Sequence, residues 1–189
     1  MEILTPKSQL NLFGYDKLFS SFIKLYKKNK LPNVMLLSGF KGLGKSTFAY
    51  HFINYLLSLE EKNKYSVENF NINSDNSTFK LIQNNIHPNF FLLENDLPDD
   101  DIKIEQVRNL IKFLSRSTYS KDLKIVFIDN VEYLNLNSSN ALLKSLEEPS
   151  KNTFFFIIHN DASAIIDTIK SRCIQFKFHF NIYEKKKYF

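Results

Sequence analysis

This 189-residue chain has only four glycines, one cysteine and no tryptophan, and three of its 25 cationic residues are arginines. The single cysteine, Cys173, excludes an internal disulfide and a zinc site built from cysteines. No apolar run approaches the roughly 18 residues that a membrane span needs, so we expect no membrane partner. Met1 to Leu10 shows no signal-peptide pattern, which predicts a reducing, cytoplasmic setting. The length suits one domain with a real core.

The glycines that are present are concentrated in one loop. The run Gly39-Phe40-Lys41-Gly42-Leu43-Gly44-Lys45-Ser46 matches the pattern G-x-x-x-x-G-K-[ST] at every fixed position. Such glycines let the backbone turn tightly and point successive N–H groups at phosphate oxygens. A lysine in this place reaches the β- and γ-phosphates, and the following hydroxyl ligates Mg²⁺. We therefore predict ATP and Mg²⁺ as cofactors, with nucleotide-binding residues Gly39, Gly42, Gly44, Lys45, Ser46 and Thr47. The other interpretation is a tight turn that binds no ligand.

An acidic residue that could hold the metal follows a second apolar run. Residues 125–128 are apolar and end at Asp129, the arrangement called Walker B, so Ser46 and Asp129 are the predicted Mg²⁺ ligands. The next residue is Asn130, where ATPases of this type usually carry the glutamate that polarises water. An amide cannot accept a proton, so we expect slow hydrolysis or none. Whether Glu132 points towards the site is left open.

The hydrophobic pattern alternates between strands and helices. Short, wholly apolar strands with helices between them are typical of a parallel sheet covered on both faces, an α/β fold. Strands are predicted at 34–37, 90–93, 125–128, 153–158 and 173–178, and helices at 16–28, 45–57, 104–114, 138–148 and 162–170. Asp161 is the expected cap of the last helix. The aspartates at 99–101 are interpreted as favouring the N-terminus of the helix at 104–114, rather than as a metal cluster.

The secondary structure of residues 60–86 is the hardest to predict from the sequence. They are rich in Asn, Ser, Lys and Glu and poor in large apolar residues. We expect a polar surface insertion, partly mobile, with a short helix near Phe79 to Asn84.

One helix and one tripeptide are specific enough to indicate a family. The run Leu142-Leu143-Lys144-Ser145-Leu146-Glu147-Glu148-Pro149, followed by Ser171-Arg172-Cys173, resembles the clamp-loader ATPases of bacterial DNA polymerase III, members of the AAA+ class. Within that family, Asn130 and the pair His159-Asn160 make the delta-prime type a better match than gamma/tau. The resemblance runs from about residue 11 to residue 178.

The resemblance implies a fold, partners and residue roles. The fold would be a P-loop NTPase of AAA+ type, a three-layer α/β/α domain at 1–180 with a five-stranded parallel sheet. The partners would be the gamma/tau and delta subunits, and through them the sliding clamp and primed DNA. Arg172 would be an arginine finger, catalytic in trans at a neighbouring ATP site, and His159 or Asn160 would be the sensor. The other interpretation of Arg172 is a surface salt bridge.

The sequence also departs from that family. Many members carry a four-cysteine zinc module where this chain has residues 60–86, so we expect no zinc here. Members continue into a helical lid and collar, which we expect to be absent, and a basic tail occupies 181–189. We therefore expect a weak or inactive ATPase that contributes to the ATP sites of neighbouring subunits.

Two functions of other classes remain open from the sequence. A small P-loop kinase of nucleosides or nucleotides would suit the length, although such enzymes usually need several arginines to clamp two phosphate chains. A nucleic-acid-binding module with a relict phosphate loop could use the lysines of the first helix, Lys24, Lys27, Lys28 and Lys30. These lysines could equally form a solvated face.

Overall fold

The structure, a computed structural model, describes residues 5–97, 99–116 and 123–179. The chain forms two compact units. Of the described residues, the sheet unit comprises 32–42, 88–97, 99–116 and 123–178, and the helical unit comprises 5–31, 43–87 and His179. The predicted basic tail at 181–189 lies outside the described residues. None of the described helices is long and apolar enough to cross a membrane.

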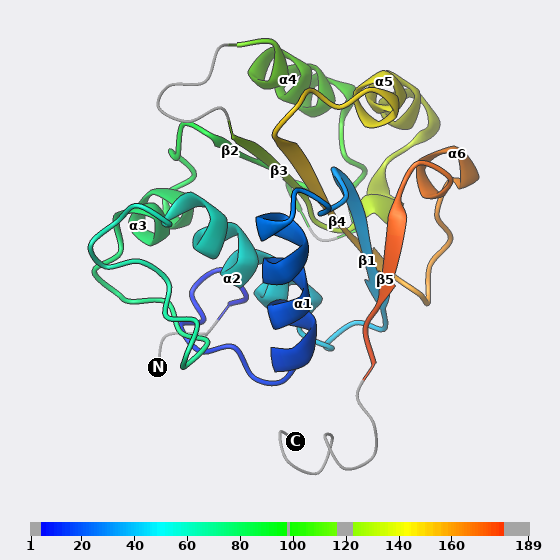
Figure 1. Ribbon diagram of the computed structural model, residues 1–189. Helices are drawn as coiled ribbons and strands as arrows, with labels where there is room; N and C mark the ends of the chain where they lie inside the picture. Colours follow the sequence, from blue (N-terminus) through cyan, green and yellow to red (C-terminus); the bar gives the residue numbers. More distant parts are fainter. Residues whose placement is uncertain (1–4, 98, 117–122, 180–189) are drawn as a thin grey trace. The chain divides into compact units, whose positions relative to one another are not determined.

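The sheet unit contains five parallel strands in the order β2-β3-β4-β1-β5. The strands are β1 (Val34–Gly39), β2 (Phe90–Leu93), β3 (Lys124–Ile128), β4 (Thr153–Asn160) and β5 (Ile174–Lys177). The apolar runs of β1 and β3 are explained by their position, because both strands are buried at every residue. The predicted α/β class, the sheet and all five strands are confirmed (Figure 1).

Three helices of the sheet unit pack against one set of strand side chains. They are α4 (Ile104–Ser115), α5 (Leu136–Glu147) and α6 (Asp167–Lys170). Alternate residues of a strand point to the same face, so one face presents Leu36, Val126, Ile128, Phe155 and Ile157. These contact a buried helical stripe made of Val107, Leu110, Leu142, Leu146 and Ile169. Helices α4 and α5 lie side by side in Figure 1.

In the sheet unit, two helices start at residues other than those predicted. Helix α6 begins at Asp167, so the helix predicted from residue 162 is wrong for its first five residues. Asn160 keeps the chain in a turn there, because its Oδ1 accepts the Ala162 N–H at 3.2 Å and its carbonyl accepts the Ser163 N–H at 2.9 Å. Helix α5 begins two residues early because Asn135 Oδ1 caps the Ser138 N–H at 3.0 Å.

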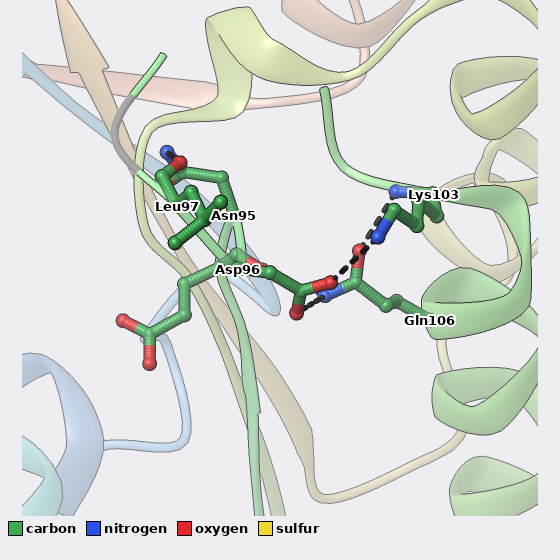
Figure 2. A network of polar contacts seen from close by, with 6 residues as sticks. Asn95, Asp96, Leu97, Lys103 and Gln106 are labelled. Carbon is green, nitrogen blue, oxygen red and sulfur yellow. Dashed lines mark hydrogen bonds and ion pairs between the residues drawn. The ribbon is translucent and has the colours of Figure 1, made fainter. Parts of the chain in front are cut away.

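A polar network orders the segment between β2 and α4 (Figure 2). Asp96 accepts from Lys103 Nζ at 3.0 Å and from Gln106 Nε2 at 3.0 Å. The hydrogen bond from Lys103 to Asp96 raises the pKa of the lysine. Gln106 Oε1 accepts the Lys103 N–H at 2.7 Å, which satisfies one of the free donors at the start of α4. Figure 2 also shows Asn95, whose side chain donates to the Leu97 carbonyl at 2.6 Å.

The aspartates at 99–101 therefore do not cap α4 as predicted. Asp99 accepts from the Tyr133 hydroxyl at 2.6 Å, and Asp101 accepts from Asn135 Nδ2 at 3.4 Å. Their hydrogen bonds connect this segment to η1 (Val131–Tyr133), a short 3-10 helix, and to the start of α5.

The helical unit is built around aromatic rings. It contains α1 (Asp16–Lys27), α2 (Lys45–Leu57) and α3 (Ser77–Gln83). Phe19 of α1 contacts Phe48 and Phe52 of α2 edge to face, with ring centroids 5.6 and 5.3 Å apart. It also stacks on Tyr65 at 5.2 Å. Such pairs contribute beyond the area they bury, which makes Phe19 the centre of this core.

Residues 60–86 are packed into this unit, which the sequence did not predict. Tyr65, Ile72 and Phe79 are buried. The buried Asn76 caps α3 by accepting the Phe79 N–H at 2.6 Å, and Glu61 accepts the Ser77 and Thr78 N–H groups at 2.9 and 3.0 Å. The predicted short helix is confirmed as α3 and begins two residues earlier.

Candidate nucleotide site and sheet edge

The glycine loop connects β1 to α2 through backbone conformations that favour glycine. Gly42 has φ 86° and Gly44 has φ 75°, both in the left-handed region. A Cβ on Gly42 would meet no atom within 4 Å, and one on Gly44 would meet only a Tyr15 ring carbon at 4.0 Å. The conformation, and not lack of space, therefore requires glycine at these two positions.

Three of the residues predicted to bind the nucleotide occupy the first turn of α2. Gly44 precedes the helix, and its carbonyl accepts the Phe48 N–H at 2.9 Å. Lys45, Ser46 and Thr47 follow; Lys45 is 5% exposed and the two hydroxyl residues are half-buried. The N–H groups at the start of a helix and the positive end of the helix dipole favour an anion at such a turn. This turn is therefore suited to a phosphate group.

Tyr15 supports this loop and was not singled out in the sequence. Its hydroxyl donates to the Leu43 carbonyl at 3.0 Å, and its ring contacts Phe48 at 6.3 Å between centroids. Both partners belong to the helical unit. A tyrosine just before the first predicted helix carries no motif, so no sequence signal could have identified this role.

At the carboxyl edge of the sheet, three neighbouring strands bring predicted site residues together. Asp129 follows β3, His159 and Asn160 end β4, and Gly39 ends β1. Gly39 and Asn160 are register partners, and the Asp161 N–H donates to the Gly39 carbonyl at 3.3 Å. The Asp129 N–H donates to the Leu93 carbonyl of β2 at 2.9 Å. In open α/β sheets, ligands bind at this edge of the strands.

Glu132 turns towards the end of β4. Its Oε2 lies 3.5 Å from His159 Nδ1 and accepts the Asn160 N–H at 3.4 Å. The side chains of Glu132 and His159 are each 7% exposed. On its other side, His159 Nε2 lies 4.0 Å from Asp161 Oδ1. The question left open by the sequence is thus answered, because Glu132 contacts the His159 ring and the backbone N–H of Asn160.

Asn130 adopts the left-handed conformation, with φ 59°. Its carbonyl accepts the Tyr133 N–H at 3.1 Å, so it begins the turn that carries Glu132 back towards β4. Asparagine tolerates this conformation better than most residues do. The backbone of Asn130 therefore has a structural role at the position where related ATPases would carry a catalytic glutamate.

Arg172 lies between α6 and β5 and forms an intramolecular ion pair with Glu147, the last residue of α5. Its Nε donates to Glu147 Oε1 at 2.8 Å, its Nη2 donates to the same oxygen, and its Nη1 donates to the Thr168 carbonyl at 2.7 Å. The Arg172 side chain is 28% exposed.

Cys173 is not a reactive thiol. Burial raises the pKa of Cys173 to about 12, and its Sγ donates to the Ile169 carbonyl at 3.1 Å. A thiol with such a pKa stays protonated at neutral pH and is a poor nucleophile.

A parallel five-stranded sheet, with a phosphate-loop sequence after β1 and an acidic residue after β3, defines a P-loop NTPase of AAA+ type. Solved structures share this fold at low sequence identity. A DNA polymerase III gamma subunit-related protein from Thermotoga maritima matches with a TM-score of 0.58 and 18% identity, over 87% of this chain and 48% of that one. The RuvB Holliday junction branch migration motor of the same organism matches with a TM-score of 0.54 and 16% identity, over 97% and 52%.

The model of the family described as DNA polymerase III, delta subunit, matches residues 14–181, and the chain belongs to this family. It is 34% identical over 140 residues to DNA polymerase III subunit delta' of Pseudomonas aeruginosa, covering 74% of this chain and 41% of that protein. It is 29% identical over 174 residues to the gamma subunit of Buchnera aphidicola, covering 91% and 45%. The chain thus spans less than half the length of these relatives.

Proposed function

We propose that this chain is the AAA+ domain, at about residues 1–180, of a delta-prime-type clamp-loader subunit of DNA polymerase III. The family match over residues 14–181 carries the proposal. Two sequence runs indicated the family, one in helix α5 and one around Arg172. Glu147 at the end of α5 binds Arg172 directly. The kinase and nucleic-acid interpretations have no comparable support. The proposed setting is the cytoplasm.

The proposed partners are the gamma/tau and delta subunits, which together would place the sliding clamp on primed DNA. The test is reconstitution of this chain with gamma/tau and delta of its own organism, followed by size-exclusion chromatography and clamp loading. We expect one complex that contains the chain and loads the clamp faster than gamma/tau and delta alone. A chain that elutes by itself and leaves loading unchanged would contradict the proposal.

ATP with Mg²⁺ is the proposed ligand of the loop and of the first turn of α2. In this proposal the loop N–H groups and Lys45 hold the phosphates, and the Ser46 hydroxyl and Asp129 hold Mg²⁺, which would neutralise phosphate charge. Zinc has no part, since residues 60–86 contain no cysteine. Asn130 cannot take a proton from water, so hydrolysis by the chain itself is proposed to be slow.

Asn160 is the proposed sensor, with His159 in a supporting role. His159 is buried beside Glu132, whereas Asn160 is half-buried and is the register partner of Gly39 at the start of the loop. Arg172 is the proposed arginine finger for the ATP site of an adjacent subunit. A guanidinium offers a planar set of donors that suits a γ-phosphate, and supplying it in trans would make turnover depend on assembly.

A further inference from the structure

The guanidinium of Arg172 is held by its own chain along one side. A guanidinium has five N–H donors in a fixed plane. The Nε and Nη2 donors that share one edge both bind Glu147 Oε1, and one Nη1 donor binds the Thr168 carbonyl at 2.7 Å. The Ser171 hydroxyl contacts Nη1 only at 3.4 Å. Among the described contacts, one Nη2 N–H has no acceptor, and the second Nη1 N–H has only the long hydrogen bond to the Ser171 hydroxyl.

The end edge of the guanidinium is formed by Nη1 and Nη2, and it matches the spacing of two phosphate oxygens. A free arginine side chain on the surface samples many rotamers, and ordering it costs free energy at the moment of binding. Here Glu147 at the end of α5 and Thr168 in α6 restrict the guanidinium before any phosphate arrives. Such advance ordering increases the effect of an interaction that forms in the transition state.

We infer that Glu147 is a positioning residue for Arg172, holding its guanidinium with the end edge available to the γ-phosphate of a nucleotide on an adjacent subunit. This inference rests on the proposed function of Arg172 as a finger. It assigns to Glu147 a role in ATP hydrolysis by the adjacent subunit. Glu147 would act through Arg172 and would not contact the nucleotide. An exposed ion pair contributes little to folding, so its value would lie in orientation.

The test uses the complex of this chain with gamma/tau and delta, and measures kcat and KM for ATP. Glu147→Gln keeps an oxygen acceptor but loses the charge, and Glu147→Ala loses both. Glu148→Gln is the matched control, at the neighbouring exposed glutamate. Arg172→Ala reports on the finger itself. Melting temperatures of all variants show whether any change is merely structural.

We expect Glu147→Ala to lower kcat at the adjacent site by about fivefold to tenfold, with KM unchanged and Glu147→Gln intermediate. Melting temperatures should match that of Glu148→Gln. If Arg172→Ala lowers kcat while the Glu147 variants match the control or exceed it, the inference is overturned and the finger stands. If Arg172→Ala has no effect in an assembled complex, the finger assignment fails, and the inference fails with it.

Discussion

Glu132 and His159 face each other at 3.5 Å in the sheet unit, and both side chains are almost fully buried. The same Glu132 oxygen accepts the backbone N–H of Asn160. The turn after β3 is thereby joined to the last residues of β4. The Walker-B aspartate precedes this turn, and the proposed sensor lies at the end of β4. We expect Glu132→Ala to cost about 1–3 kcal/mol of unfolding free energy, because the Asn160 N–H loses its acceptor and the buried His159 loses the neighbouring carboxylate.

Chemical denaturation at pH 7 measures this loss. Glu132→Gln should lose less, since its amide oxygen can still accept the Asn160 N–H. Glu148→Ala is the control, because Glu148 is exposed on the surface after α5. Equal stability of Glu132→Ala and the control would show that the contact contributes nothing.

The loop is expected to bind ATP through Lys45. Lys45→Ala should weaken the binding of labelled ATP at least tenfold, because a charge-assisted contact to phosphate is lost. Lys41→Ala is the matched control, since Lys41 is an exposed lysine of the same loop at a position the motif does not fix. Equal affinities for the two variants would contradict the assignment.

Rapid ATP hydrolysis by the unaltered chain would contradict the interpretation of Asn130.

His51 is expected to make stability depend on pH. Burial lowers its pKa to about 4, from an ordinary value of 6.5, and its ring contacts the Tyr65 hydroxyl and the Gln9 carbonyl at 3.0 Å each. The folded chain keeps this ring neutral while the unfolded chain takes a proton below pH 6.5. Stability from this group is therefore lost as the pH falls from 6.5 to 4, by about 1.4 kcal/mol per pH unit.

Unfolding free energies between pH 4 and 7 check this expectation. Carboxylates contribute to the same curve, so the informative quantity is the difference between the unaltered chain and His51→Gln. The variant should show a shallower slope over that window. His179→Gln, at an exposed histidine, should keep the slope of the unaltered chain. A His51→Gln curve parallel to the original would contradict the buried neutral ring.

Lys124 is expected to stabilise the end of α4. Its ammonium donates to the Phe113 carbonyl at 3.2 Å, to the Leu114 carbonyl at 2.5 Å and to the Arg116 carbonyl, and burial lowers its pKa. These carbonyls lie where a helix has no partners of its own. Lys124→Met should cost about 1–3 kcal/mol in thermal unfolding. Lys112→Met, at an exposed lysine of α4, should be nearly neutral, and equal losses would refute the capping role.

Most of the fold could be predicted because periodicity is a local signal. Helix α2 has the predicted bounds, 45–57, since the glycine loop and the apolar pattern both delimit it. Helix α6 was predicted too long because the hydrogen bonds of Asn160 hold the preceding residues in a turn. The packing of residues 60–86 was not predicted because Asn and Glu usually lie on the surface. Asn76 and Glu61 instead cap α3.

Site residues that belong to a sequence motif could be predicted. Site residues that are far apart in the sequence and meet only in the folded sheet could not. The loop and Asp129 follow fixed patterns. Glu132 and His159 are 27 positions apart in sequence, and they meet because β3 and β4 are adjacent strands. Glu147 ends α5 whereas Arg172 follows α6, so their pairing could not be predicted from the sequence.

Steady-state ATP hydrolysis by the reconstituted complex is the measurement that tests the central claim most directly. It compares Arg172→Ala with Arg108→Ala, a control at an exposed arginine that pairs with Glu105 on α4. The proposed role of Arg172 predicts normal assembly for both variants, with clamp-stimulated turnover reduced at least tenfold only in Arg172→Ala. Full turnover by an assembled Arg172→Ala complex would contradict it.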